Sequence, residues 1–380
     1  MAPSAIEPTV TDVPPQPKWH VPACPDTLKE RLSKAGIDES TYPGPPTIPY
    51  YYQDAMAVKK DPWEYNDAGI RAMQTDKTKS SLLNAATKVT DLTTNIGTEI
   101  EGLQLKDLTS QQRDELALLI AERCVVFFRD QDITPQQQEE LGKYYGRVEI
   151  HPHVPHVPGA EGATVIWDAL KSEGRKSGTF RNPGGTYRWH SDIAHERQPP
   201  AYAHLHNDTI PSTGGDTVWA SGYAAYDKLS PAFRQFIDGK KAVFRSTHSY
   251  VDRDDPHGAR RYNENIHPIV RVHPVTGWKS LWLNRNYTQR IVGLEKAESD
   301  AILNYLYDVF EHNLDIQVRF KWTPNASALW DNRVTIHNAI WDYEGREPRH
   351  GTRVMTLGEK PYFDENAVSR RQALGLEDSE

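Results

Sequence analysis

Apolar residues recur with different spacings along the first half of the folded region, and each spacing predicts a type of element. A glycine interrupts the apolar positions of Ile96–Leu103, which predicts a pair of short strands. Helical spacing over Ser110–Arg123 predicts an amphipathic helix with Ser110 as its cap. The β-branched and aromatic run Cys124–Phe128 predicts a buried strand, and Thr134–Tyr145, which opens with a Thr-Pro pair, predicts a second helix.

From Thr164 onward, short apolar runs are separated by glycine and proline. Helical spacing is kept only by Ala224–Asp238 and Lys296–Glu311. The other runs predict strands at Thr164–Trp167, Tyr202–Asn207, Thr217–Ala220, Val243–Ser246, Ile269–His273, Lys279–Leu283, Ala328–Asp331 and Arg353–Leu357. Many short strands with few helices are typical of a β-sandwich or barrel. The predicted fold class is therefore mainly β with flanking helices, a double-stranded β-helix (jelly roll).

The composition divides the chain into three parts. Residues 1–87 are rich in proline, tyrosine and charge, so we expect an extended arm draped over the core, with its first 20 or so residues disordered. Residues 88–365 carry the periodic pattern and form the predicted jelly-roll domain. Residues 366–380 are expected to form a polar C-terminal tail.

Charge, hydropathy and cysteine content exclude several classes of protein. The 44 Lys and Arg residues and 52 Asp and Glu residues give a formal charge of −8, so we expect no nucleic acid partner. No apolar run approaches the roughly 18 residues of a membrane span, and the N-terminus lacks the pattern of a secretory signal. Cys24 and Cys124 are too few for a disulfide framework. We therefore expect a cytoplasmic protein with no membrane partner.

One pair among the 15 histidines and their neighbouring carboxylates has the spacing of a metal site. His190 and Asp192 have the same parity, so on a strand they would project from one face and share an ion. His337 follows an apolar strand far along the chain. Two histidines and one carboxylate on one side of a metal leave open positions for a substrate and O₂, and the same set also binds zinc.

Two arginines follow the last of these histidines. Arg349 and Arg353 are four residues apart, so same parity places both guanidinium groups on one face of the following strand. A guanidinium matches the planar geometry of a carboxylate, and the hydroxyl of Thr217 is a further candidate for binding it. The sequence therefore predicts a site for a small carboxylate beside the metal.

Five segments, in this order, resemble the Fe(II)/2-oxoglutarate dioxygenases of the taurine dioxygenase family. They are WHSD (189–192), QPPAY (198–202), GGDTVWASGYAAYDKLSP (214–231), WDNRVTIH (330–337) and RHGTR (349–353). The resemblance covers about residues 88–365 and implies a jelly roll of the 2-oxoglutarate oxygenase type. The N-terminal arm and ENIHPIVRVHPVTG (264–277) are similar to the fungal sulfonate dioxygenase branch.

The resemblance implies roles for individual residues. Iron would be held by His190, Asp192 and His337, and the distal carboxylate of 2-oxoglutarate by Arg349 with Thr217.

Three further residues are implied near the substrate. Arg353 would lie near the 1-carboxylate of 2-oxoglutarate and the anionic head of the substrate, which His151 would also bind. The backbone N–H of Ile193 is a further candidate for that anion, because it lies one residue past Asp192. Tyr287 would line the pocket. Val154 and Thr186 replace an aromatic residue and an asparagine of the family, which implies a roomier pocket.

The implied reaction uses Fe(II), 2-oxoglutarate and O₂ to hydroxylate a small anionic substrate. For an aliphatic sulfonate the products are an aldehyde, sulfite, succinate and CO₂. The alternatives are the same chemistry on an alkyl sulfate, an aryloxyalkanoate or another small organic acid. A zinc hydrolase and a non-catalytic jelly-roll binding module are alternatives from other classes. The family also implies a homo-oligomer, either a dimer or a tetramer.

Overall fold

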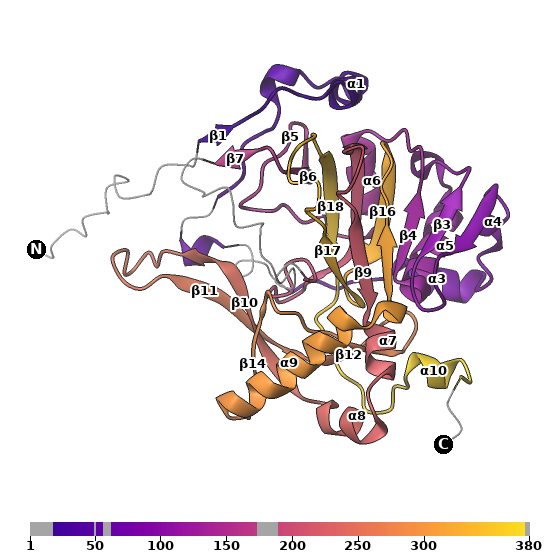
Figure 1. The fold of residues 1–380 in the computed structure, drawn as a ribbon, viewed down its shortest axis with the longest axis vertical. Coiled ribbons are helices and arrows are strands. Elements are labelled where there is room, and N and C mark those ends of the chain that lie inside the picture. Colours follow the sequence, from indigo (N-terminus) through magenta and orange to yellow (C-terminus); the bar gives the residue numbers. More distant parts are fainter. Residues whose placement is uncertain (1–17, 49–50, 56–61, 173–188, 377–380) are drawn as a thin grey trace, which may run out of the picture.

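The structure is a computed structural model that describes residues 18–48, 51–55, 62–172 and 189–376 (Figure 1). Within these residues, the largest sheet has eight strands in the order β2-β3-β4-β16-β8-β18-β6-β5. β3 and β4 are parallel, and the other neighbours in this sheet are antiparallel. The strands are β2 (Lys88–Asp91), β3 (Thr98–Glu101), β4 (Val125–Phe128), β16 (Ala326–Asp331), β8 (Pro200–Thr209), β18 (His350–Leu357), β6 (Ala160–Trp167) and β5 (His156–Val157).

A second sheet faces the first one across a shared core. Its order is β15 (Gln317–Phe320), β9 (Thr217–Ser221) and β17 (Thr335–Ala339). Phe127 of β4 stacks on Phe320 with ring centroids 4.0 Å apart and meets Trp219 of β9 at 5.3 Å. Because buried side chains of both sheets form one cluster, the two sheets pack face to face as in a jelly roll. The predicted fold class is confirmed.

Two helices cover the outer face of the larger sheet, as Figure 1 shows: α5 (Ser110–Arg123) and α6 (Pro135–Tyr145). Leu116 and Ile120 of α5 pack in one cluster with Phe128 of β4. Strand β4 therefore has a core on each side, which explains its continuous apolar run. Both helices match their predicted ranges, although Thr109, rather than Ser110, caps α5 by accepting a hydrogen bond from the amide of Gln112.

Helix α6 packs very closely on strand β18, which contains Arg353. Gly142 of α6 faces Val354 of β18, and a Cβ at position 142 would lie 2.5 Å from Cγ1 of that valine. This approach is possible only because residue 142 has no side chain.

The second half of the chain adds smaller sheets and helices below the jelly roll in Figure 1. These are α7 (Gly222–Asp227), α8 (Pro231–Ile237), β10 (Lys241–Tyr250), β11 (Arg261–Pro268), β12 (Val270–Val272), β13 (Lys279–Leu281), β14 (Thr288–Ile291), α9 (Lys296–His312) and the short helix η6 (Leu314–Ile316). The single helix predicted over Ala224–Asp238 is wrong, because Ser230 precedes a proline and begins a new helix by capping α8. Strands β11, β14 and β15 were not predicted, since their sequences are largely polar.

The N-terminal segment, predicted to be an extended arm, is partly helical. Its elements are β1 (Trp19–His20), α1 (Asp26–Lys34), η2 (Glu39–Thr41), η3 (Tyr52–Asp54), α3 (Ala68–Thr75) and α4 (Ser80–Leu83); β1 pairs with β7 (Lys171–Ser172), and η4 (Leu105–Asp107) precedes α5. The expectation of a wholly extended arm is therefore wrong for α1, which buries Leu28 and Leu32 against the jelly roll. The predicted disorder of the first residues concerns residues 1–17, which lie outside the described residues.

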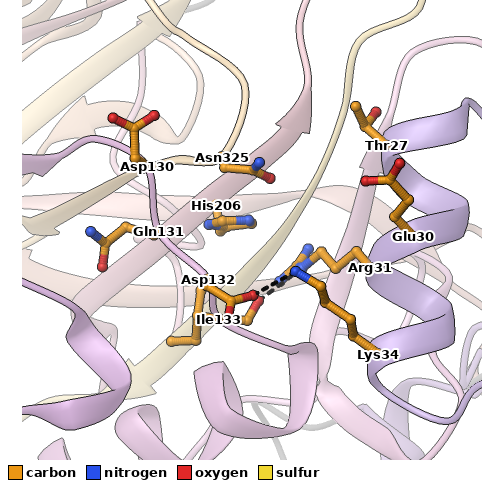
Figure 2. A pocket seen from close by; sticks show the side chains of 10 residues that line it. All are labelled: Thr27, Glu30, Arg31, Lys34, Asp130, Gln131, Asp132, Ile133, His206 and Asn325. Atoms are coloured by element: carbon orange, nitrogen blue, oxygen red, sulfur yellow. Dashed lines mark hydrogen bonds and ion pairs between the residues drawn. The ribbon is translucent and has the colours of Figure 1, made fainter.

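Arg31 fastens α1 to the jelly roll. Its buried guanidinium donates to Asp208 at 3.2 Å, to the hydroxyl of Thr352 at 2.8 Å, to Gln138 at 3.1 Å and to the carbonyl of Ile133 at 3.0 Å. A hollow of about 160 Å³ lies beside it, between α1 and residues 130–133 (Figure 2). None of the predicted site residues lines this hollow.

The C-terminal segment, expected to be a polar tail, packs on the domain in part. It forms α10 (Arg370–Ala373), and the guanidinium of Arg370 lies 5.9 Å from the ring centroid of Trp278. Residues 377–380 are not described. Across the described parts of the chain, no helix combines the length and the apolar character that crossing a membrane requires.

Candidate functional site

His190 and His337 are brought together by a backbone bridge. The amide of His190 donates to the carbonyl of His337 at 3.0 Å, and the reverse bond is 2.8 Å. Their ring centroids are 4.3 Å apart. The strand that we predicted for His190 and Asp192 is only this isolated bridge, because the chain turns at Asp192 and Ile193 has a φ of +37°. The turn, rather than strand parity, aims the carboxylate at the histidines.

Asp192 completes a group of three possible metal ligands. Its Oδ1 lies 3.6 Å from Nε2 of His190, and its Oδ2 lies 3.9 Å from Nε2 of His337. One ligand atom from each residue lies within 4.8 Å of the others. Asp192 Oδ2 is buried and has no hydrogen-bond partner among the described residues. A buried carboxylate oxygen without a partner is costly, so this atom fits a bound cation.

The electrostatics of the site favour the forms that bind a metal. Burial by itself raises the pKa of the Asp192 carboxyl, but Arg353, His337 and His190 outweigh it and hold that pKa well below its usual range. Burial, together with His190, lowers the pKa of His337 to about 3. At neutral pH the site therefore offers an ionised carboxylate and a neutral imidazole, both of which can coordinate a cation.

Arg353 contacts the proposed ligand set directly. It lies on β18, and its Nη1 donates to Oδ1 of Asp192 at 2.5 Å. Its Nε is buried without a hydrogen-bond partner among the described residues. The guanidinium therefore has donor capacity left for a further anion.

Arg349 lies just before β18 and contacts a different group. Its Nε donates to the carbonyl of Gly215 at 3.2 Å, and its buried Nη2 has no partner in the described part of the chain. Gly215 has a φ of +74°, and a Cβ there would lie 3.3 Å from Cδ of Arg349. Thr217 begins β9 two residues later, and its hydroxyl accepts from the indole N–H of Trp322 at 3.0 Å. Arg349 thus contacts Gly215, which precedes Thr217 by two residues.

His151 lies close to the charges of the site. Its Nδ1 accepts a hydrogen bond from the amide of His153 at 3.2 Å, so a neutral ring carries its proton on Nε2. Burial, then the positive charge of Arg353, lowers the pKa of His151 well below its usual value. The ring is therefore a neutral N–H donor at neutral pH.

Tyr287 and Ile193 meet each other beside Asp192. A hydrogen bond from the backbone N–H of Ile193 reaches the Tyr287 hydroxyl, whose pKa is raised, mainly by burial and then by the charge of Asp192. The ring of Tyr287 lies 5.2 Å from that of His195. Of the two positions that depart from the family pattern, Val154 lies in the half-buried loop after His151, and Thr186 falls outside the described residues.

Two residues that contact the site were not assigned a role from the sequence. Asn332 binds the backbone of Asp192, and Trp322 binds the hydroxyl of Thr217. Asn332 belongs to the WDNRVTIH segment, so its position in that segment was the available signal. Trp322 lies between β15 and β16, outside the five segments that resemble the family, and carried no such signal.

Comparisons with known proteins agree on one family. Residues 88–355 match the family model described as "Taurine catabolism dioxygenase TauD, TfdA family". A Schizosaccharomyces pombe protein named "Putative alpha-ketoglutarate-dependent sulfonate dioxygenase" is 39% identical over 313 residues, which cover 82% of this chain and 78% of that protein. The "Alpha-ketoglutarate-dependent sulfonate dioxygenase" of Saccharomyces cerevisiae is 34% identical over 310 residues, covering 79% and 74%. The crystal structure of a taurine dioxygenase from Burkholderia xenovorans has a TM-score of 0.63 and 30% identity, covering 76% of this chain and 98% of that chain.

Proposed function

The chain belongs to the taurine dioxygenase (TauD/TfdA) family, and we propose that it oxidises small aliphatic sulfonates at the centre formed by His190, Asp192 and His337. It is a 2-oxoglutarate-dependent dioxygenase that uses Fe(II), 2-oxoglutarate and O₂. The observation that supports the substrate proposal is the ion pair of Arg353 with Asp192, because it would put a cation for the substrate's anion directly beside a proposed metal ligand.

Fe(II) would be held by Nε2 of His190, Nε2 of His337 and the carboxylate of Asp192. The supporting observation is the buried Oδ2 of Asp192, which has no partner in the described residues and lies 3.9 Å from Nε2 of His337. When bound, iron with O₂ and 2-oxoglutarate supplies the oxidation of a C–H bond, and 2-oxoglutarate becomes succinate and CO₂. These three ligands also suit zinc, but a zinc hydrolase has no use for 2-oxoglutarate.

Arg349 and Arg353 would bind different anionic groups of 2-oxoglutarate and the substrate. Arg349, with the Thr217 hydroxyl, would bind the distal carboxylate of 2-oxoglutarate, since its buried Nη2 has a donor without a partner in the described residues. Arg353 would lie between the 1-carboxylate and the head of the substrate, with its buried Nε available. A guanidinium suits both tasks, because its planar donors pair with two oxygen atoms at once.

Neutral donors around Arg353 would complete the site for a sulfonate. A sulfonate has three acceptor oxygens and one negative charge, so one cation and several neutral N–H groups match it. The Nε2–H of His151 is such a group. The amide of Ile193, which donates to the Tyr287 hydroxyl in this structure, would be a second one if the bound anion took the place of that hydroxyl, and Tyr287 would then line the pocket beside it. Close docking of the anion would place the adjacent carbon next to the metal ligands.

The proposed reaction balances without a further reductant. One atom of O₂ enters succinate, and the other becomes a hydroxyl on the carbon that carries the sulfonate. The hydroxyl then loses its proton, the C–O bond becomes a carbonyl, and the C–S bond breaks with its electron pair on sulfur. The products are an aldehyde and sulfite.

A substrate panel tests the proposal. The purified enzyme is incubated with Fe(II), 2-oxoglutarate, O₂ and one candidate from aliphatic sulfonates, alkyl sulfates, aryloxyalkanoates and simple organic acids. We expect sulfite and succinate in equal amounts with sulfonates. Sulfate release from an alkyl sulfate, or stoichiometric succinate with another acid and no sulfite from any sulfonate, would replace the sulfonate proposal with that class.

A matched pair of variants tests the anion site. His151→Ala removes a donor and should weaken sulfonate use while it leaves the slow, substrate-free decarboxylation of 2-oxoglutarate nearly unchanged. The exposed His257 gives the control, and His257→Ala should behave like the wild type. Equal sulfonate use by both variants would remove His151 from the site.

The setting in which the enzyme works is also part of this proposal. We propose a cytoplasmic homo-oligomer, a dimer or a tetramer, that acts on a free small molecule without a nucleic acid or membrane partner. The formal charge of −8 speaks against phosphate-backbone binding, and both cysteines are buried and free of disulfides. Light scattering on the eluting protein measures the mass, and a monomer at working concentration would contradict the oligomer.

A further inference from the structure

The side chain of Asn332 holds the backbone of Asp192 on both sides of its Cα. Oδ1 of Asn332 accepts from the amide of Asp192 at 2.8 Å, and Nδ2 donates to the Asp192 carbonyl at 2.9 Å. These two bonds fix the peptide unit before Asp192 and the peptide unit after it. They therefore define the direction of its Cα–Cβ bond and of the carboxylate that follows.

Asn332 is itself held firmly. It is fully buried, its amide donates to the carbonyl of Ala201 at 2.7 Å, and its carbonyl accepts from the indole of Trp282 at 3.2 Å. Its neighbours on both sides form a buried ion pair, in which Nη2 of Arg333 lies 2.6 Å from Oδ2 of Asp331. The side-chain amide that binds Asp192 therefore belongs to a buried residue whose own backbone is fixed by hydrogen bonds to the jelly roll.

The two hydrogen bonds from Asn332 to Asp192 belong to a row of contacts that three consecutive residues, 190 to 192, make with the segment 332–337. His190 pairs with His337 through the backbone, and Ser191 donates its hydroxyl to the carbonyl of Thr335 at 2.6 Å. Asp192, the third residue, lies in a turn and has no strand partner. At this point the side chain of Asn332 takes the place that a neighbouring strand would have.

Ile193 shows why this substitute is needed. Its φ of +37° lies in a region that a β-branched residue rarely adopts. Such a conformation persists only where the surroundings hold it. The bond from Nδ2 of Asn332 to the Asp192 carbonyl acts on the very peptide unit that joins Asp192 to Ile193.

We propose that Asn332 is a positioning residue for the metal centre: it sets the carboxylate of Asp192 through the backbone and touches neither metal nor substrate. This inference rests on the proposed role of Asp192 as a ligand. Second-layer groups that orient ligands typically account for roughly 10–100-fold in metal affinity. The amide is suited to the task, because it presents one acceptor and one donor and adds no charge.

Binding of Mn(II) alone to the apo full-length protein tests the inference without turnover. Free Mn(II) is counted by electron paramagnetic resonance during a titration, and the unfolding temperature is measured without metal. Asn332→Ala should raise the Kd for Mn(II) by about 10–100-fold. The control is Asn263→Ala, which removes the same amide from another buried asparagine, 2% exposed on β11, and should leave the Kd within twofold of the wild type.

A second variant removes the ambiguity of folding. Asn332→Asp keeps the volume and the acceptor of the Asp192 amide but replaces the donor with a negative charge. If the added negative charge were the only effect, the Kd for Mn(II) would fall. If Asp192 lost its position, the Kd would rise, so the direction of the change in Kd distinguishes the two effects. Weaker binding at an unfolding temperature close to that of the wild type is the expected result, and unchanged or tighter binding overturns the proposal.

Asp192→Ala separates this failure from failure of the metal centre. If it leaves the Kd for Mn(II) unchanged, Asp192 is not a ligand and the proposed centre is wrong. If Asp192→Ala abolishes Mn(II) binding while both Asn332 variants bind like the wild type, the centre stands and only the positioning role is lost.

Discussion

Arg353 and Asp192 form an ion pair inside the site, with Nη1 2.5 Å from Oδ1. The side chains of both residues are largely buried, at 14% and 4% exposure. Oδ1 of this carboxylate therefore pairs with a cation of the protein and also lies 3.6 Å from Nε2 of His190, while Oδ2 lies 3.9 Å from Nε2 of His337. A substitution of Arg353 should therefore also alter the charge environment of the Asp192 carboxylate, and the reverse holds as well.

The ligand set is tested by the complex that forms without oxygen. Wild-type protein mixed anaerobically with Fe(II) and 2-oxoglutarate should develop a visible charge-transfer absorption. His190→Ala and Asp192→Ala each remove one ligand, so both should lose this absorption and all turnover while the circular dichroism of the fold is kept. Undiminished absorption in either variant would show that the altered residue is not a ligand.

Arg349 is expected to govern the 2-oxoglutarate requirement. Arg349→Leu would remove one partner of the proposed pair with the distal carboxylate of 2-oxoglutarate; losing such a buried partner costs about 2–5 kcal/mol, so the KM for 2-oxoglutarate should rise at least 30-fold or so. Arg349→Lys should recover only part of the loss, because an ammonium cannot form two parallel bonds. Steady-state kinetics at saturating sulfonate measure both values, and an unchanged KM in both variants would assign the role elsewhere.

Arg31 is expected to contribute strongly to stability. Arg31→Met leaves the buried carboxylate of Asp208 without its guanidinium partner, and breaking such a pair costs about 3–5 kcal/mol of the free energy of unfolding. Lys34 lies one turn further along α1 and forms an exposed ion pair with Asp132 at 3.0 Å, so Lys34→Met should cost only about 0–1 kcal/mol. Denaturant titrations of both variants compare the two costs. Similar losses would contradict the anchoring role of Arg31.

The buried histidines of the larger sheet predict sensitivity to acid. Burial, then Arg31, lowers the pKa of His204 to about 3 from its ordinary 6.5. The unfolded state thus binds the proton first, and the neutral buried ring stabilises the fold fully above pH 6.5 and progressively less as the pH falls toward 3. The loss approaches about 1.4 kcal/mol per pH unit for this one group. His204→Gln should flatten the pH dependence of stability, and His257→Gln should not.

The sequence predicted the elements whose pattern depends on local packing. Cys124–Phe128 is apolar throughout because β4 has a core on each face, so its strand was visible from composition alone. Strand β11 was missed because polarity does not follow its burial: polar Asn263 and His267 are buried, while Ile266 is exposed. Helix α1 was missed because Arg31 finds its partners 102 to 321 residues away, and no local pattern encodes such contacts.

In the site, too, the residue types could be predicted from the sequence, whereas features that depend on contacts between distant residues could not. The residue types and their order identified His190, Asp192 and His337, and the structure gathers them. Strand parity was the wrong explanation for why Asp192 lies close to the histidines, because Asp192 is in a turn and not in a strand. Periodicity gave no sign of Asn332, since hydrogen bonds to a backbone 140 residues away leave no periodic trace, and only its position in the WDNRVTIH segment pointed to it.

The close packing of Gly142 on Val354 links the outer layer of the protein to its reactive interior. Replacing a glycine inside a helix by alanine normally strengthens that helix by about 1 kcal/mol, so Gly142→Ala looks attractive to an engineer who wants a more robust enzyme. Here the added methyl would press on Val354, and Arg353 is the next residue on the same strand. The mutation would stabilise α6 while it displaced Arg353, the residue that we propose binds the substrate's anion. A remote helix face thus limits how far this enzyme can be stabilised without loss of catalysis.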